Sequence, residues 1–153
     1  MKLVVQRVSE ARVDIDGKCV GQIGRGLCVL AGIRTDDTTD DVDWLVGKLV
    51  KMRIFPDADG VMNLSLLDTG GELLVVSQFT LYALTARGNR PSYIKAAGPD
   101  VAVPLYERFI AALDRELAPL GHKVQTGVFG ADMRVSLVND GPVTIVIDSK
   151  NRE

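Results

Sequence analysis

The polar side chains of Ser77-Gln78-Phe79-Thr80 interrupt an apolar segment and are the first candidates for chemistry. Residues 72–81 read ELLVVSQFTL, so an apolar run gives way to hydroxyl and amide groups near its end. Functional sites often form beyond the carboxyl ends of buried strands. A threonine hydroxyl acts as a nucleophile only beside an activating group. The alternative is an ordinary strand end whose hydroxyl groups hydrogen-bond to the backbone.

A polar loop supplies the second candidate. Residues 82–99 are rich in Gly, Arg, Asn and Pro and are longer than an ordinary connection. Arg87 and Arg90 could offer guanidinium groups to phosphate, and Tyr93 could stack on a base. The alternative is a solvated loop without a ligand.

The third candidate is the pair Gly141-Pro142 within the stretch VSLVNDGPVTIVID. Asn-Asp-Gly between two β-branched runs predicts a turn between strands. The proline removes a backbone donor at the point where the second strand would begin to pair. From the local sequence alone we predict a rigid hairpin entrance at a sheet edge.

The sequence lacks the motifs of several common catalytic and binding sites. The chain contains no HExxH, CxxC, GxxxxGK[ST] or GxSxG motif and has a single histidine, His122. We therefore expect no metal site, no cofactor and no serine hydrolase elbow. His122 follows a glycine at a predicted helix end, where a solvated or capping histidine is expected.

The composition bounds the class of protein. A chain of 153 residues with 46% hydrophobic and 25% charged residues is typical of one soluble globular domain, residues 1–153. The net charge of −2 indicates that any nucleic acid is met through a local patch. The apolar runs are too short for a membrane span, and the first residues do not resemble a secretory signal. With Cys19 and Cys28 in strand-like settings, we expect reduced thiols and a cytoplasmic protein.

Hydrophobic periodicity predicts a mostly antiparallel sheet system with two helices. The helices are expected at residues 38–52, with Thr38 and Asp41 as a capping box, and at residues 100–121, with Asp100 as N-cap. The expected strands cover residues 2–8, 11–16, 18–24, 27–33, 53–55, 72–81, 123–129, 133–138 and 143–148.

Taken together, these stretches resemble the D-aminoacyl-tRNA deacylase family, also called D-tyrosyl-tRNA deacylase. The matching motifs occur in order from residue 6 to residue 144, and SQFTL together with NDGPVT is far more specific than either alone. They are Gln6-Arg7-Val8, Ser77-Gln78-Phe79-Thr80-Leu81, Arg90-Pro91-Ser92, Thr126-Gly127, Ala131-Asp132-Met133 and residues 135–144.

The resemblance implies a three-layer α/β/β domain with barrel-like sheets and two main helices. It also implies a homodimeric enzyme that hydrolyses the ester bond of D-aminoacyl-tRNA, accepts mischarged glycyl-tRNA and rejects L-amino acids. In the family, Gly141-Pro142 would be a cis pair inserted into the partner's active site and fixed by Arg7. The resemblance places Ser77, Gln78, Phe79 and Thr80 along the pocket, with Phe129 and Met133 nearby.

Two chemical routes fit these residues. Thr80 could attack the ester, although no base is visible beside it. Alternatively, water attacks with help from the ribose 2′-hydroxyl, and the backbone N–H of Phe79 or Thr80 stabilises the oxyanion; we expect this second route. A non-catalytic module that binds the aminoacyl end of tRNA is the rival function, and a plain esterase is a third.

Overall fold

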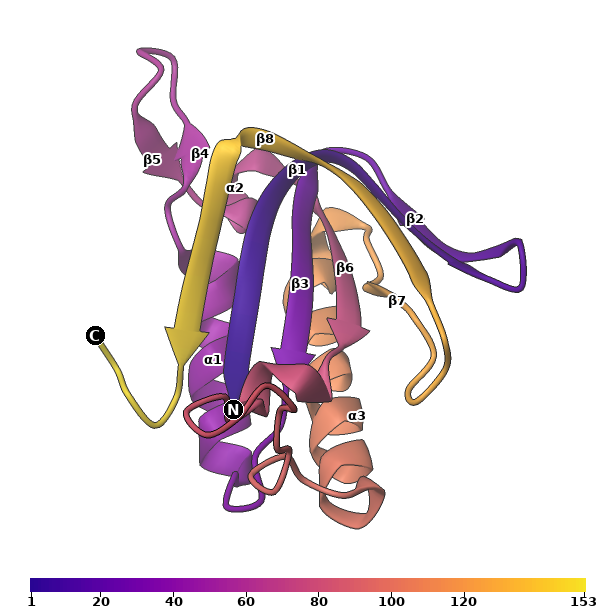
Figure 1. Ribbon diagram of the computed structural model, residues 1–153. Helices are drawn as coiled ribbons and strands as arrows, with labels where there is room; N and C mark the ends of the chain where they lie inside the picture. The colour runs from indigo at the N-terminus through magenta and orange to yellow at the C-terminus, as the bar shows by residue number, and fades with distance from the viewer.

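A long central strand, β1 (Lys2–Ile15), organises the sheet. The computed structural model describes residues 1–153. β1 pairs antiparallel with β2 (Lys18–Ile23), β3 (Gly26–Gly32) and β8 (Arg134–Asp148). Beyond β3 the pairing is parallel, first to β6 (Glu72–Ser77) and then to β7 (Gln125–Thr126). Antiparallel pairing therefore predominates, as expected, in a single α/β domain (Figure 1).

The sheet curls until its two ends approach each other, which makes it barrel-like. β2 and β7 stand at opposite ends of the strand order β2-β1-β3-β6-β7. Nevertheless, a Cβ added to Gly21 of β2 would lie 2.8 Å from the carbonyl oxygen of Thr126 in β7. Such a close approach of two backbones requires glycine. A small apolar core fills the curled part of the sheet: Val8, Ala11, Val13, Ile23, Cys28, Leu74 and Val76.

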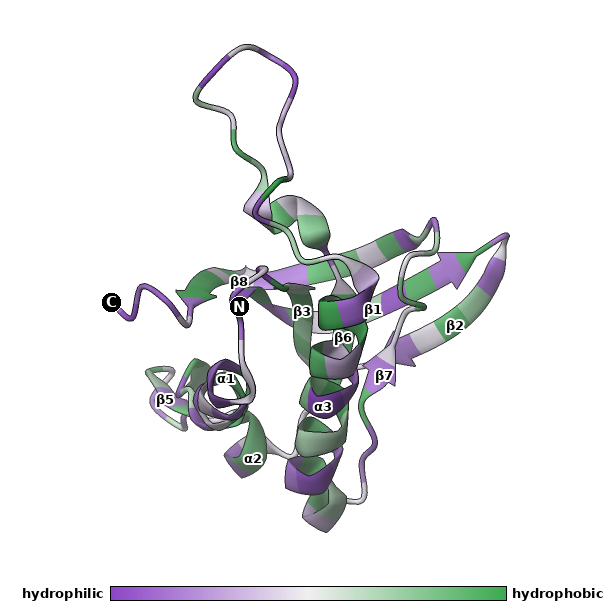
Figure 2. Ribbon diagram, turned by 90° about the horizontal axis from the view of Figure 1, so that it is seen from below, coloured by the Kyte–Doolittle hydropathy of each residue, from purple (hydrophilic) through white to green (hydrophobic).

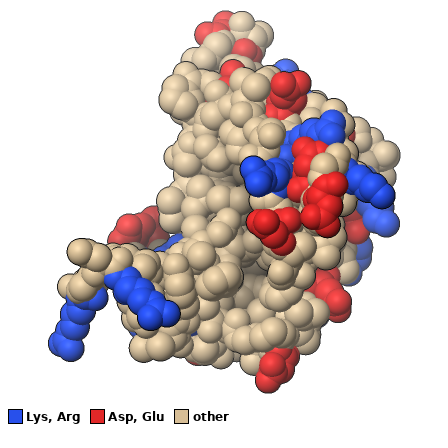
Figure 3. Space-filling view, turned by 45° about the vertical axis from the view of Figure 1, so that its right-hand side comes forward, with Lys and Arg blue, Asp and Glu red and all other residues tan.

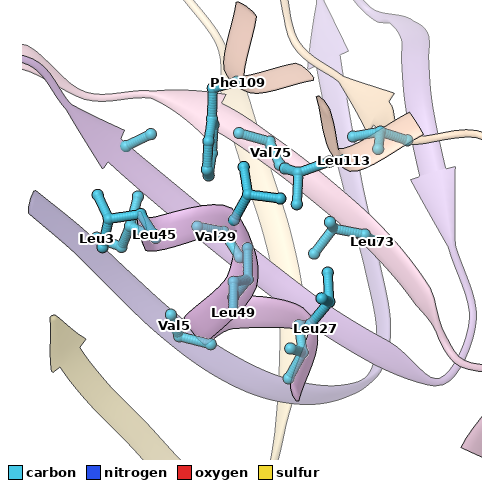
Figure 4. Packing of buried hydrophobic residues seen from close by; sticks show 14 of the residues in the cluster. Leu3, Val5, Leu27, Val29, Leu45, Leu49, Leu73, Val75, Phe109 and Leu113 are labelled. Atoms are coloured by element: carbon cyan, nitrogen blue, oxygen red, sulfur yellow. The ribbon is translucent and has the colours of Figure 1, made fainter. Parts of the chain in front are cut away.

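Helices α1 (Thr39–Lys51) and α3 (Pro99–Leu117) cover one face of the sheet (Figures 1 and 2). The main core lies between these two helices and strands β1, β3 and β6, as Figure 4 shows for Leu3, Val5, Leu27, Val29, Leu45, Leu49, Leu73, Val75, Phe109 and Leu113. Each fully buried side chain of this size contributes about 1.5–3 kcal/mol. No helix is long and apolar enough to cross a membrane.

The start of α1 confirms the predicted capping box. The Thr38 N–H donates to the Asp41 carboxylate at 2.8 Å, and the Lys150 ammonium donates to the same carboxylate oxygen at 2.8 Å. Burial opposes ionisation of Asp41, but these hydrogen bonds outweigh it and hold the pKa of the carboxyl well below its usual range. Helix α3 begins after Gly98 rather than at Asp100, because Pro99 has the backbone angle that the first helical position needs.

Short elements complete the fold. β4 (Phe55–Pro56) and β5 (Met62–Leu64) form a separate hairpin, followed by the one-turn helix α2 (Leu66–Thr69). The short helices η1 (Phe79–Tyr82) and η2 (Ala118–Leu120) follow β6 and α3. The strand predicted at residues 72–81 thus ends at Ser77, and the strand predicted at residues 123–129 is reduced to β7.

The predicted hairpin at Asn-Asp-Gly-Pro is wrong. The strands predicted at residues 133–138 and 143–148 fall together in the single strand β8, which begins at Arg134, and both halves pair with β1. Val8 pairs with Asn139 and Gln6 pairs with Thr144, so residues 140–143 stand opposite Arg7 alone. The turn residues therefore form a large bulge within one strand. The strands predicted at residues 2–8 and 11–16 are likewise the single strand β1.

Candidate functional site

The chain turns sharply where β6 ends, and this turn exposes the segment after Ser77. The Gln78 N–H donates to the Ala31 carbonyl of β3 at 2.8 Å, which holds the first residue beyond the strand. Helix η1 follows at once, and its first two N–H groups, of Phe79 and Thr80, donate no hydrogen bond within the chain. The Phe79 side chain is 56% exposed. The turn therefore presents free backbone donors beside an aromatic ring.

A pocket of about 300 Å³ opens beside this turn. One wall is the strand end and turn, and the other is the loop that precedes β8. Five residues singled out from the sequence line it: Ser77, Gln78, Phe79, Phe129 and Met133. The structure thus brings together segments that are about fifty positions apart in the chain.

The lining includes residues that sequence reasoning did not select. Ala97, just before α3, and Ala102, in its first turns, contribute to the lining, and Asp132 is its one ionisable residue. The motif Ala131-Asp132-Met133 carried a signal for Asp132, whereas the small side chains of the two alanines carried none. The pocket is otherwise mostly apolar, which suits a weakly polar group.

Tyr106 of α3 supports the Phe129 wall from behind. The two ring centroids lie 5.7 Å apart, and the Tyr106 hydroxyl donates to the Val75 carbonyl at 3.3 Å. Burial raises the pKa of Tyr106 to about 12, so its hydroxyl stays protonated as a donor. Gly127 supports the same wall at Met133, because a Cβ at this position would overlap the sulfur of Met133.

Thr80 lies next to the pocket rather than in its lining. Its Oγ1 accepts a hydrogen bond from the Gln78 side-chain amide, and no histidine or carboxylate contacts it. A neutral amide does not take up a proton at ordinary pH, so it is no general base. The hydroxyl of Thr80 therefore lacks the activation that a nucleophile needs.

The peptide bond between Gly141 and Pro142 is cis, and both residues are exposed in the bulge of β8. The buried Arg7 side chain donates from Nε to the Asp140 carbonyl at 3.1 Å and from Nη1 to the Ile54 carbonyl at 2.7 Å. The Asn139 Oδ1 accepts from the Val143 N–H at 2.9 Å and so ties the two ends of the bulge together. Gly141 has a φ of 132°, a conformation that glycine favours.

Within one chain, this bulge lies at the level where β6 begins, whereas the pocket lies where β6 ends. Asn139 is level with Val8, which pairs with Gly26, and Gly26 pairs with Glu72 at the start of β6. The pocket lies at Ser77, five residues further along β6. At about 3.3 Å per residue, the two levels differ by about 16 Å. A single chain therefore does not bring Gly141-Pro142 to its own pocket.

Arg87 and Arg90 lie on a loop that projects away from the helices (Figure 2). Leu84 and Ser92 pair with each other at its base, so both arginines stand beyond this closure and are exposed. Neither arginine forms an ion pair within the chain, so both guanidinium groups are open to an anionic partner.

Comparisons with known proteins are consistent over the whole chain. The sequence profile of D-Tyr-tRNA(Tyr) deacylase matches residues 4–148. The chain is similar to the D-aminoacyl-tRNA deacylases of Flavobacterium psychrophilum, at 60% identity, and Bacteroides thetaiotaomicron, at 58%, over 100% of each chain.

Two solved structures share the fold. One is described as c-Myc DNA Unwinding Element Binding Protein and has a TM-score of 0.90 and 40% identity, over 97% of this chain and 98% of that chain. The other, described as a probable eukaryotic D-amino acid tRNA deacylase, has a TM-score of 0.80 over 95% and 97%. Its identity of 19% supports the fold alone.

Proposed function

The chain belongs to the D-Tyr-tRNA(Tyr) deacylase family, hydrolases of the aminoacyl-tRNA ester bond, and we propose that it releases free D-amino acids from tRNA while it spares L-aminoacyl-tRNA. The family match over residues 4–148 carries this proposal. The pocket beside Ser77-Gln78-Phe79-Thr80 supports it, because the motif of the resemblance meets a cavity there. We place the reaction, a quality-control step of translation, in the cytoplasm.

In this reaction, water adds to the ester carbonyl, the bond from the carbonyl carbon to the ribose oxygen breaks, and that oxygen takes a proton. The free N–H groups of Phe79 and Thr80 are suited to stabilise the oxyanion that forms. The ribose 2′-hydroxyl of the substrate assists the attack, since the chain offers Thr80 no base. Ser77 and Gln78 complete this side of the pocket.

A Thr80→Ala variant tests the choice of route. If the backbone N–H groups do the work, the variant keeps most of its rate, because the substitution leaves them in place. A trapped acyl ester on Thr80, or loss of nearly all activity with a normal fold, would show that the hydroxyl is the nucleophile.

Chiral selection is assigned to Gly141-Pro142 of a second subunit in a homodimer. Arg7 fixes the bulge through the neighbouring Asp140 carbonyl. The backbone carbonyls of Gly141 and Pro142 do not change rotamer, so they can bind the α-amino group and leave no room for Cβ on the L side. Glycine has no Cβ, which accounts for the acceptance of glycyl-tRNA. The distance between the bulge and the pocket of the same chain supports a contribution from a partner.

Mixed dimers test this assignment. A chain with a Gly141→Ala substitution is combined with a chain in which Phe129→Trp and Met133→Trp fill the pocket. Each homodimer should be inactive. In the mixed dimer, the unfilled pocket of one chain meets the intact Gly141 of the other, so one site is restored and each dimer should have about half of the wild-type activity. A protein that is active as a monomer would contradict the shared site.

The decisive assay measures amino acid released from D-tyrosyl-tRNA, L-tyrosyl-tRNA and glycyl-tRNA by the purified protein. No release from the D-form would leave a module that only binds the aminoacyl end of tRNA. Equal release from both enantiomers would end the chiral proposal. Cleavage of small esters without tRNA would identify a plain esterase.

Arg87 and Arg90 are proposed to contact tRNA phosphates. Each exchange for alanine should weaken binding and lower the salt dependence of log K by about one unit of slope. An unchanged salt dependence would remove that arginine from the interface.

A further inference from the structure

We propose that Tyr93 and Phe79 form a stacking platform for an unpaired base at the 3′ end of the tRNA. The inference rests on the proposed function and adds a contact to it, namely the place where the single-stranded end lies as its ester enters the pocket. Tyr93 belongs to the segment of residues 83–97, which we call the arm, and Phe79 belongs to η1.

The arm is anchored at its base and free at its tip. Leu84 and Ser92 exchange two backbone hydrogen bonds of 2.8 and 3.0 Å, and the Ala97 N–H donates to the Ile33 carbonyl at 2.9 Å. Residues 85–91 form no backbone hydrogen bonds with the rest of the chain. The arm therefore stands out from the sheet on the side away from α1 and α3 (Figure 2).

Two aromatic rings meet where the arm joins the pocket. The centroids of Phe79 and Tyr93 lie 5.0 Å apart, and their planes are inclined at 72°. This edge-to-face contact orients the Tyr93 ring, while 56% of Phe79 and 38% of Tyr93 remain exposed. Phe79 also lines the pocket. The pair thus offers an oriented aromatic surface at the pocket mouth.

The charge of the arm indicates which partner covers these rings. Residues 83–97 include Arg87, Arg90 and Lys95 and no acidic residue, although the whole chain carries a net charge of −2. All three cations are exposed, and Figure 3 shows basic side chains on the projecting segment. A partner with both negative charge and flat apolar faces is a single-stranded nucleic acid. The four unpaired nucleotides at the 3′ end of a tRNA have this chemistry.

An acceptor-stem minihelix with a free 3′-hydroxyl tests the platform by binding alone. The fluorescent base 2-aminopurine replaces each of the four unpaired bases in turn, since its emission falls when it stacks on an aromatic ring. The wild-type protein should quench at least one position. Tyr93→Ala should abolish that quenching and weaken binding about 10-fold, a typical loss for one stacked base. Tyr93→Phe should keep both.

Ile94→Ala is the matched control, because its side chain is adjacent, apolar and 78% exposed but cannot stack. It should bind and quench as the wild type does. In deacylation, Tyr93→Ala should raise KM and leave kcat nearly unchanged, as expected when binding is lost equally in the ground and transition states.

Three results would overturn the platform: no quenching at any position, equal binding and quenching by Tyr93→Ala, or a shift of that variant from dimer to monomer. The last would assign the rings to contact with a second copy of the chain. The proposed function is tested separately, by deacylation: if it is wrong, D-aminoacyl-tRNA stays intact after incubation with the wild-type protein.

Discussion

Arg7 should contribute more to stability than any exposed ion pair of this protein, and Arg7→Met isolates the reason. Methionine keeps an unbranched apolar stem but removes every donor. The Ile54 carbonyl then loses the hydrogen bond of 2.7 Å from Nη1, at a residue that is 6% exposed. Leaving a buried carbonyl unpaired costs about 1–3 kcal/mol.

The contact with Asp140 has two parts of unequal weight. The carbonyl of Asp140 accepts from Nε at 3.1 Å, whereas its carboxylate lies 3.4 Å from Nε with a side chain that is 49% exposed. Ion pairs this exposed contribute about 0–1 kcal/mol. The sum for Arg7→Met is therefore about 1–4 kcal/mol. Asp140→Asn, which keeps the carbonyl and loses only the ion pair, should cost less than about 1 kcal/mol.

Urea unfolding followed by circular dichroism measures both free energies of unfolding. The same variants are assayed on D-tyrosyl-tRNA and L-tyrosyl-tRNA under conditions in which each remains folded. Arg7→Met should lose deacylation through the released bulge at Gly141-Pro142, and Asp140→Asn should retain it. If Asp140→Asn destabilises the protein as much as Arg7→Met, the exposed ion pair carries the stability and the argument from the buried carbonyl is refuted.

Three further outcomes can be measured. Gly127→Ala should displace the flexible Met133 side chain and lower kcat/KM about 10- to 100-fold with little change in Tm. This effect of Gly127→Ala should vanish in a Met133→Ala background. Additive effects in the double variant would show that the two residues act independently. The Asp41 carboxyl has a lowered pKa in the folded state, so its stabilisation is present above its ordinary pKa of 3.8 and is lost as the pH falls below that value; Asp41→Asn should flatten the acid limb of a stability-against-pH curve, and an unchanged limb would contradict this. Burial raises the pKa of Cys28 to about 11 while Cys19 is exposed, so the native protein should present one thiol to Ellman's reagent at pH 8 and two after unfolding; two rapidly reacting thiols in the native protein would show that Cys28 is accessible.

Local patterns in the sequence were sufficient for features that depend on neighbouring residues. The capping box at Thr38 and Asp41 was predictable because both partners lie within one helical turn. The apolar period of α1 likewise identified the face that meets the sheet. The resemblance located the motif around Gln78 and the pair Gly141-Pro142, since these are runs of adjacent residues.

Only the tertiary structure decided how distant segments meet. Local turn signals at Asn139 predicted a hairpin, but pairing of both halves of β8 with β1 outweighed them. That pairing satisfies the backbone of a long strand and packs its partly buried inner face against the core. The same register placed Gly141-Pro142 away from its own pocket. The absence of a base beside Thr80 and the presence of Tyr93 against Phe79 also depend on contacts across the fold. Residue type and spacing therefore indicated which groups could act, and strand register together with packing determined which of them are neighbours.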